Sequence, residues 1–497
     1  MPNAPSVQTD QKFLVKGTLY SFLGTALKVI GPVLTIVVAR VFGKALFGVY
    51  VSTQLLMLTI SCIAVLGLDK GLHWYLPQNL VHGRPPYTGI MEAMRKAVAF
   101  AGIITVALLV FAVLGCQHFF SGLKTLSSLE ITIYSLSLIP RVVLLVWGGA
   151  SEGNRHPQYK IIINDFAVSA LAPVIALGLY YCFGLWNTAL PLGLTIANYM
   201  GAVAYFKIIR RQFPDMPWIP KARITKELWN YSLPIGFSEV VASFLMRADL
   251  WLVLALLGPA DAGVYAVMVT ISNGLKTIRQ SYNPILLPVV AGMSEDRLKT
   301  DLKPVYTYCV SMLTLIQLVI GFFIIIFPKE TLMIAGKAFV MDPEVLGILL
   351  LGNLLNGMFG LSGSVINGLG KSRFMFFMNT VVLIVALASN AVLIPLLGIA
   401  GAALSTMLYQ VVQSVWMNIY LVRLGLWPYQ KQLFVQGLWI FILILMYLFF
   451  NLYFYPSIPV KIGIYALALL FLAGTFYFQG LAGSKYSKKS KPAPRRL

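Results

Sequence analysis

The sequence has few charged residues, and acidic residues are the scarcest of them. Asp and Glu together number 17 among 497 residues, Lys and Arg number 38, and charged residues make up 11% of the chain. Hydrophobic residues make up 58%, and the mean hydropathy is +0.80. A soluble domain has about 25% charged residues, so this composition excludes one. We expect a membrane protein that crosses the bilayer many times.

Cysteine and histidine are also scarce, with four of each. The cysteines are more than fifty residues apart, which excludes a disulfide framework and gives no metal-ligand spacing. No Ser, His and Asp grouping indicates a nucleophilic site. The stretch Gly368-Leu369-Gly370-Lys371-Ser372 ends like a phosphate-binding loop, but it lacks that motif's first glycine and its preceding strand. We expect no metal, no cofactor and no enzymatic activity.

Long apolar runs dominate the chain. About 20 residues at 1.5 Å per residue span the ~30 Å hydrocarbon layer, and continuous rather than alternating runs favour helices over a β-barrel. The sequence predicts an all-α polytopic membrane protein with about fourteen transmembrane helices. These lie at residues 18–40, 46–68, 97–115, 129–149, 161–182, 186–206, 228–256, 262–290, 305–327, 344–365, 374–394, 398–421, 433–453 and 459–479.

The Lys and Arg residues predict the orientation. With a cytoplasmic N-terminus, cytoplasmic segments hold 27 of them and external loops hold six. Both termini are therefore expected in the cytoplasm. The net charge of +21 is then mostly a topological signal, spread over short loops that contact anionic lipid headgroups and not nucleic acid.

The second half of the sequence repeats the first at an offset of 215 residues. Gly43, Gly48 and Tyr50 recur with the same spacing as Gly258, Gly263 and Tyr265. The same offset relates Gly153 to Gly368 and Asn164 to Asn379. Six spans separate equivalent helices, so the halves are predicted to be parallel repeats about an axis along the membrane normal, with the two Gly–Tyr turns lying together. The alternative is that glycine recurs by chance in membrane turns.

This repeat predicts a domain organisation of two six-helix lobes plus two C-terminal helices. The predicted parts are a cytoplasmic N-terminal segment 1–17, an N-lobe 18–210, a cytoplasmic linker 211–227, a C-lobe 228–425, the last two spans within 426–480 and a basic cytoplasmic tail 481–497.

Five cations lie within the apolar spans, namely Lys28, Arg141, Arg247, Lys276 and Arg279. A charge at the centre of a membrane helix costs ~3 kcal/mol on insertion scales, so such residues face protein or water and are functional by default. We predict that these five line a hydrated substrate-binding cavity. The alternative is pairing with intramembrane carboxylates, for which the candidates are Glu239, Asp249, Asp165 and Glu130.

Glu239 and Asp249 have a second interpretation as ion-coupling residues. Carboxylates that face a cavity can bind a proton or Na⁺ and so link transport to an ion gradient. The competing interpretation is that Asp249 joins a charge cluster with Arg247, although residues two apart on a helix do not face each other. The sequence alone does not choose between them.

Two stretches resemble a known family. Ala39-Arg40-Val41-Phe42-Gly43-Lys44-Ala45-Leu46-Phe47-Gly48-Val49-Tyr50 and Arg247-Ala248-Asp249-Leu250-Trp251-Leu252 are similar to the opening and the seventh span of Wzx-type polysaccharide transporters. That superfamily also contains multidrug extruders and peptidoglycan-precursor flippases. The resemblance implies a V-shaped pair of lobes that moves undecaprenyl-pyrophosphate-linked oligosaccharides outward across a bacterial inner membrane. It further admits a polysaccharide polymerase and chain-length machinery as partners.

Three alternatives to an oligosaccharide flippase remain open. The two extra C-terminal spans also occur in flippases for lipid II, the peptidoglycan precursor. A multidrug extruder shares the architecture, but five intramembrane cations suit a cationic drug poorly. A membrane-embedded glycosyltransferase would need acidic or metal-binding residues in a sizeable loop, and the longest internal loop, 69–96, has only Asp69 and Glu92 as acids.

The asymmetry of Lys and Arg predicts that residues 207–227 are cytoplasmic. In a variant that lacks the native cysteines, a cysteine introduced at position 220 should react with an impermeant thiol reagent only from the cytoplasmic side. Labelling from outside would contradict the fourteen-span topology.

Overall fold

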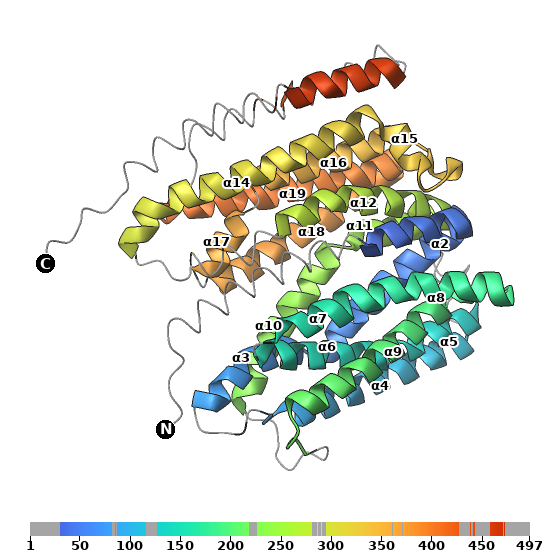
Figure 1. The fold of residues 1–497 in the computed structure, drawn as a ribbon, viewed down its shortest axis with the longest axis vertical. Helices are drawn as coiled ribbons and strands as arrows, with labels where there is room; N and C mark the ends of the chain where they lie inside the picture. The colour runs from blue at the N-terminus through green and yellow to red at the C-terminus, as the bar shows by residue number, and fades with distance from the viewer. Residues whose placement is uncertain are drawn as a thin grey trace, which may run out of the picture. The chain divides into compact units, whose positions relative to one another are not determined.

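The computed structural model describes residues 30–426 and 458–470 with short internal gaps. The gaps are residues 82–84, 86, 116–126, 155, 218–225, 281–285, 287–289, 291–294, 360 and 370, and four further residues (438, 441, 442 and 472) are described singly. Within these ranges the regular structure is helical and contains no strand. The all-helical fold that the sequence predicts is confirmed (Figure 1).

The contacts divide the chain into two compact units. Unit 1 comprises Met1–Gly274, Leu332–Met341 and Ser372–Tyr409, and unit 2 comprises Leu275–Thr331, Asp342–Lys371 and Gln410–Leu497. These boundaries differ from those of the lobes expected at 18–210 and 228–425, and the lobe assignment stays a prediction.

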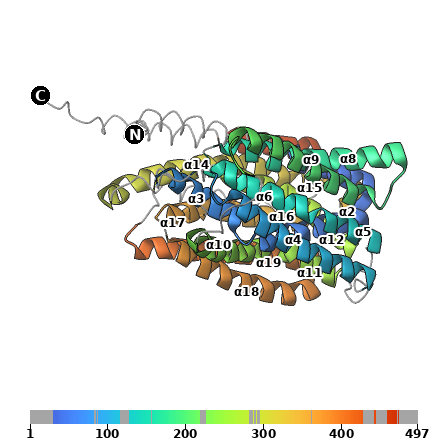
Figure 2. The ribbon, with the colours of Figure 1, turned by 90° about the horizontal axis from the view of Figure 1, so that it is seen from below.

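Unit 1 contains most of the helices. They are α2 (Ile30–Val65), α3 (Leu68–Val81), α4 (Ile90–Val113), α5 (Ser128–Leu136), α6 (Leu138–Gly153), α7 (Pro157–Lys160), the π-helix η2 (Ile161–Ala167), α8 (Val168–Phe183), α9 (Ala189–Gln212), α10 (Lys226–Leu245), α11 (Ala248–Leu256), most of α12 (Pro259–Gln280), η3 (Lys337–Phe339), α18 (Ser372–Leu397) and the first part of α19 (Ile399–Arg423). Figures 1 and 2 show α8 and α9 running alongside each other.

Unit 2 contains the remaining helices. They are α14 (Glu295–Ile326), most of α15 (Pro328–Met333), α16 (Pro343–Phe359), α17 (Ser362–Gly368), the end of α19 and an apolar helix at Ile458–Leu470. The last of these corresponds to the predicted fourteenth span, whereas the thirteenth lies outside the described residues except at 438, 441 and 442.

Seven described helices are long and apolar enough to cross a membrane. They span Gly31–Val65, Ile90–Val113, Ser128–Gly153, Gln158–Phe183, Ala189–Gln212, Cys309–Ile326 and Arg373–Leu397. The pair Pro343–Phe359 and Ser362–Gly368, bent by 42°, makes an eighth. The first of them merges two predicted spans, which meet at Gly43. A multi-spanning membrane fold is confirmed, and fourteen stays an approximate count because other predicted spans are broken, shorter or outside the described residues.

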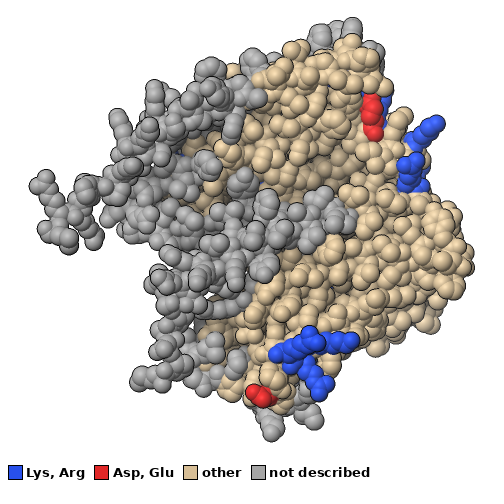
Figure 3. Space-filling model, viewed as in Figure 1, with Lys and Arg blue, Asp and Glu red and all other residues tan. Residues whose placement is uncertain are grey.

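A cluster of basic residues on unit 1 lies at the end of a helix. Lys207, Arg210 and Arg211 are exposed where α9 ends, and the basic side chains near the lower edge of Figure 3 gather over this end. The visible face of unit 1 beside them is largely uncharged. This distribution fits a helix that leaves hydrocarbon at its basic end.

Helix α6 lies at the centre of unit 1, where it contacts α2, α3, α4 and α9. It starts after a break from α5, and Pro140 explains the break because its ring clashes with the carbonyl of residue 136, the last of α5. Small residues then let neighbours approach closely. A β-carbon on Gly149 would collide with the Asp69 carbonyl, and one on Gly153 would crowd that of Leu72.

The two Gly–Tyr turns lie in direct contact, as predicted from the repeat. Gly43 and Gly258 both have left-handed backbones, with φ of 76° and 98°. A β-carbon on Gly48 would collide with the Pro259 carbonyl, and one on Gly263 would collide with the Lys44 carbonyl. Lys44 and Pro259 are themselves 215 residues apart, so the contact is reciprocal, and each turn uses the same positions against the other.

The C-terminal helix at Ile458–Leu470 is bound to unit 2 by specific contacts. Lys461 Nζ lies 2.7 Å from Glu330 Oε1, and Tyr465 packs edge-on against Phe323 with ring centroids 5.5 Å apart. Partial burial by itself would raise the pKa of the Glu330 carboxyl group. The hydrogen bond from Lys461 has the opposite and larger effect, so the pKa of Glu330 is lowered. This helix is therefore a fixed part of unit 2.

The close approach of the two turns predicts that an added methyl group lowers the stability of the protein at Gly48 but not at Gly178. Gly48→Ala should lower thermal stability in detergent, because overpacking against backbone costs about 1–3 kcal/mol. Gly178→Ala is the matched control, since its β-carbon meets nothing within 4 Å and alanine favours a helix. Equal unfolding midpoints for the two variants would contradict the contact.

Candidate functional site

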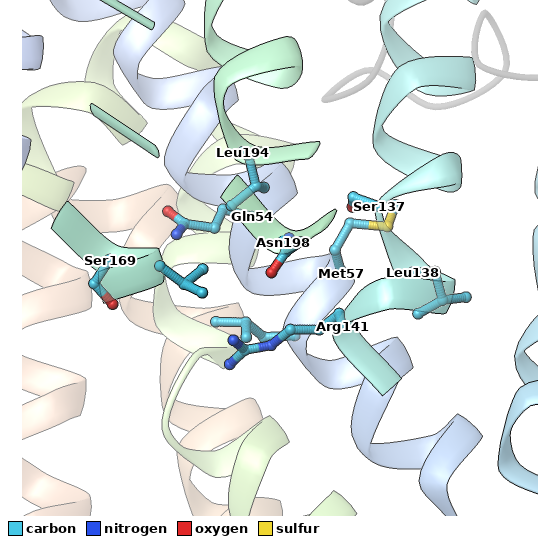
Figure 4. Close-up of a pocket in the computed structure, with 10 residues that line it drawn as sticks. Gln54, Met57, Ser137, Leu138, Arg141, Ser169, Leu194 and Asn198 are labelled. Atoms are coloured by element: carbon cyan, nitrogen blue, oxygen red, sulfur yellow. The ribbon is translucent and has the colours of Figure 1, made fainter. Parts of the chain in front are cut away.

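Arg141 lines a cavity inside unit 1. It lies near the middle of the membrane span Ser128–Gly153, and the cavity has a volume of about 100 Å³. Helices α2, α6, α8 and α9 and the α5–α6 junction supply the walls. The lining residues are Gln54, Met57, Leu58, Ser137, Leu138, Arg141, Val168, Ser169, Leu194 and Asn198. Figure 4 shows the polar side chains of Gln54, Asn198 and Arg141 around one space.

Two amides line this cavity, and one of them has a buried oxygen without a partner among the described residues. Asn198 is 2% exposed, and its Oδ1 atom is buried without a hydrogen-bond partner among the described residues. Gln54 is half-buried and also lines the cavity. The Ser137 hydroxyl, in contrast, donates to the Tyr134 carbonyl oxygen at 2.6 Å. Buried polar groups normally pair with protein or water, so this cavity is suited to a polar occupant.

Asp249 is buried in a hydroxyl network within unit 1. The Tyr265 hydroxyl donates to Asp249 Oδ2 at 2.9 Å, and the Thr406 hydroxyl donates to the same oxygen at 3.1 Å. The Leu250 amide donates to Asp249 Oδ1 at 2.8 Å. Hydroxyl and amide donors stabilise a carboxylate charge. Oxygen atoms from three helices, α11, α12 and α19, therefore meet at one carboxylate.

Arg247 lies at a break in the predicted seventh span. Helix α10 ends at Leu245 and α11 begins at Ala248, with Arg247 between them at φ −135°. Its Nη1 atom donates to the Ser243 carbonyl oxygen at 3.3 Å. Arg247 and Asp249 thus have different hydrogen-bond partners.

Glu239 lies at a second place, on the contact between α10 and α3. Its half-exposed carboxylate lies 4.0 Å from Lys70 Nζ. Burial by itself would lower the pKa of the Lys70 ammonium. The nearby carboxylates of Glu239, Asp69 and Glu152 have the larger effect, so the pKa is raised. One turn further along α3, Trp74 stacks on Tyr231 with ring centroids 4.1 Å apart.

A further charged group joins α3, α6 and α7. Lys160 Nζ lies 2.8 Å from Glu152 Oε2, and His73 Nδ1 lies 3.9 Å from the same oxygen. Burial lowers the pKa of His73, and Glu152 opposes this effect, so the imidazole is mostly neutral at pH 7. This group and the Lys70–Glu239 pair lie outside the Arg141 cavity.

The other predicted site residues have separate positions. Lys276 and Arg279 lie on the last turns of α12, which belong to unit 2, and both have interaction partners. Lys28 lies outside the described residues, as does the side chain of Asp165. Glu130 forms a capping box with Ser127 at the start of α5, with Ser127 N donating to Glu130 Oε2 at 2.7 Å. Its role is to cap a helix.

Four residues at these sites are not predicted as site residues from the sequence. Gln54 and Asn198 are uncharged amides, so a search for intramembrane charges passes over them. Tyr265 was singled out for its place in the repeat, not as a partner of Asp249. Thr406 lies 157 residues from Asp249, and no local pattern connects them.

The hydroxyl network predicts a measurable contribution from Tyr265. Tyr265→Phe removes a donor to Asp249 and should lower the unfolding free energy by about 0.6–3 kcal/mol, the range between average membrane hydrogen bonds and those to charged groups. Because Thr406 shares the same oxygen, Thr406→Val should be non-additive with it in a double-mutant cycle. Tyr181→Phe, at a residue 71% exposed, is the control. Additive effects would contradict the shared network.

Solved structures of membrane transporters share this fold. The lipid II flippase MurJ in an inward closed conformation aligns with a TM-score of 0.65 and 12% identity, covering 94% of this chain and 100% of MurJ. An inward-facing multidrug resistance MATE transporter of the MOP superfamily aligns with a TM-score of 0.64 and 14% identity, covering 86% and 99%. A MOP superfamily transporter from Pyrococcus furiosus aligns at 0.58 and 12%, covering 87% and 96%.

The family is shown by the sequence itself. No curated protein sequence matches the chain, but a family model described as polysaccharide biosynthesis protein matches residues 14–294, more than half of it. This match confirms the predicted family resemblance, and the fold shared with the solved structures is that of a multi-pass membrane protein. The chain belongs to the polysaccharide biosynthesis protein family.

Proposed function

We propose that the protein is a flippase that moves an undecaprenyl-pyrophosphate-linked oligosaccharide from the cytoplasmic to the external leaflet of a bacterial inner membrane. Family membership and the shared transporter fold support this proposal. The observation that carries it furthest is a polar cavity with a cation, Arg141, in the middle of a membrane span. An external polysaccharide polymerase with chain-length machinery would consume the product.

The pyrophosphate headgroup also needs cations along its path. An ionised phosphate loses its hydration in hydrocarbon at a prohibitive cost, and charge-assisted hydrogen bonds from Arg or Lys offset that cost. Arg247, Lys276 and Arg279 are the described candidates to neutralise the pyrophosphate, together with Lys28. The same cations disfavour the extrusion of cationic drugs, whereas flipping of lipid II uses the same chemistry and is the second candidate.

Asp249 is the proposed coupling residue. Its carboxylate accepts hydrogen bonds from the Tyr265 and Thr406 hydroxyl groups. When Na⁺ binds, the hydroxyl oxygens can become ligands of the ion. When a proton binds instead, the carboxylate is neutralised and these hydrogen bonds can be released. A discontinuous span beside the site supports this role, since ion sites of transporters form at broken helices. Glu239, which pairs with Lys70, is the second proposed coupling residue.

Transport is proposed to proceed by alternating access, with one repeat moving against the other. The contact between α3 and α10 is suited to opening, because a half-exposed ion pair and one ring stack can separate and re-form. The reciprocal contact between the two Gly–Tyr turns is backbone against backbone and has no comparable hydrated groups.

Purified protein in liposomes tests the proposal directly. The native protein should flip a lipid-linked oligosaccharide, and Arg247→Gln should slow flipping about tenfold or more, because hydrogen bonds to charged groups contribute ~1.5–3 kcal/mol. Asp249→Asn should remove the dependence on a proton or Na⁺ gradient. Arg210→Gln, at an exposed helix end, is the control. Native-like flipping by both variants would contradict the assigned roles, and no flipping by the native protein would contradict the function.

A further inference from the structure

The cavity around Arg141 is poorly matched to a pyrophosphate. Arg141 is the one charged residue among the described residues that line it. A pyrophosphate diester carries a negative charge on each phosphoryl group, so one charge would stay without a counter-ion in the middle of the bundle. An uncompensated buried charge is among the most costly groups in a protein. The cavity therefore favours a neutral polar ligand.

The amides of the cavity specify that ligand further. The Asn198 carbonyl oxygen is buried without a partner among the described residues, so the occupant must donate a hydrogen bond to it. In the opposite amide orientation this position would present a donor, but the amide still has one donor side and one acceptor side, so a ligand that both donates and accepts satisfies it in either orientation. Gln54 offers the same pair of functions, and Arg141 offers only donors. An ionised pyrophosphate diester has no donor to give.

A hydroxyl group both donates and accepts, which is the pattern that these side chains require. Ser169 adds a hydroxyl at the more exposed side of the cavity. Met57, Leu138 and Leu194 supply apolar walls, which suit the C–H face of a sugar ring. We propose that the Gln54–Arg141–Asn198 cavity is a saccharide subsite, which binds the hydroxyl edge of one sugar of the transported glycan and not its pyrophosphate.

The size of the cavity agrees with an edge rather than a whole sugar. A volume of about 100 Å³ has room for a few water molecules, because one water needs at least ~10–15 Å³ of such space. Two or three hydroxyl groups replace those waters, while the rest of the ring stays outside. Recognition by hydroxyl groups also gives selectivity, because a ligand that lacks one of them leaves a buried amide unpaired.

This assignment rests on the proposed function only in naming the sugar as part of a lipid-linked glycan. It concerns the saccharide alone, which binds the amides of unit 1. Binding of free sugars tests it without any transport assay.

The probes are a panel of methyl hexosides and methyl N-acetylhexosaminides, with inorganic pyrophosphate as the competing ligand. Thermal unfolding of the purified full-length protein in detergent is measured against probe concentration, which gives a dissociation constant. At least one glycoside should raise the unfolding midpoint. Asn198→Leu should weaken its binding about tenfold, which corresponds to the ~1.4 kcal/mol expected for a lost hydrogen bond.

Asn390→Leu is the matched control, because Asn390 is equally buried but belongs to α18. It should bind the glycoside as the native protein does. If Asn198→Leu does not fold, Gln54→Leu takes its place, with the unliganded midpoint as the test of folding. The proposal is overturned if no glycoside stabilises the protein or if pyrophosphate stabilises it through Arg141. It is also overturned if glycoside binding is unchanged in the cavity variants Asn198→Leu and Gln54→Leu. Glycoside binding with no lipid flipping would instead contradict the proposed transport.

Discussion

Hydrocarbon offers no hydrogen bonds, so a polar group inside a membrane span must find its partner in the protein, in water or in a ligand. Asp249 satisfies this constraint internally through Tyr265, Thr406 and a backbone amide. Asn198 does not, since its buried oxygen has no partner among the described residues. The same constraint thus separates two kinds of site, one complete in itself and one that is complete only when occupied.

The sequence predicts the fold well where the physics is local. The length of an apolar run indicates where a helix can cross the membrane. The glycines that recur at an offset of 215 residues correctly predict that two turns far apart in the sequence lie together. Breaks are harder to predict. Pro140 marks the break before α6, but the break at Met246 and Arg247 in the seventh span has neither proline nor glycine to signal it.

The candidate site is predicted only in part, because charge is easier to find than complementarity. Arg141 is conspicuous as a cation within an apolar run, and the structure places it in a cavity. Gln54 and Asn198 carry no charge that would mark them in an apolar helix, and their convergence depends on how α2 and α9 each pack against α6 and α8. Glu130 looks like a partner for cations in the sequence, yet it caps α5 through Ser127, an interaction that the Ser-x-x-Glu spacing itself signals.

The reciprocal contact of the Gly–Tyr turns has the geometry of an interface between two identical subunits. Lys44 and Gly48 face Gly263 and Pro259, which are their own counterparts in the repeat, as residues do across the axis of a symmetric dimer. In an unfused homodimer any mutation here would appear on both sides at once and its cost would double. Joining the two copies in one chain removes that restriction. Each half could then acquire its own chemistry, such as Arg141 in one and Asp249 in the other, while the contact between the turns was kept.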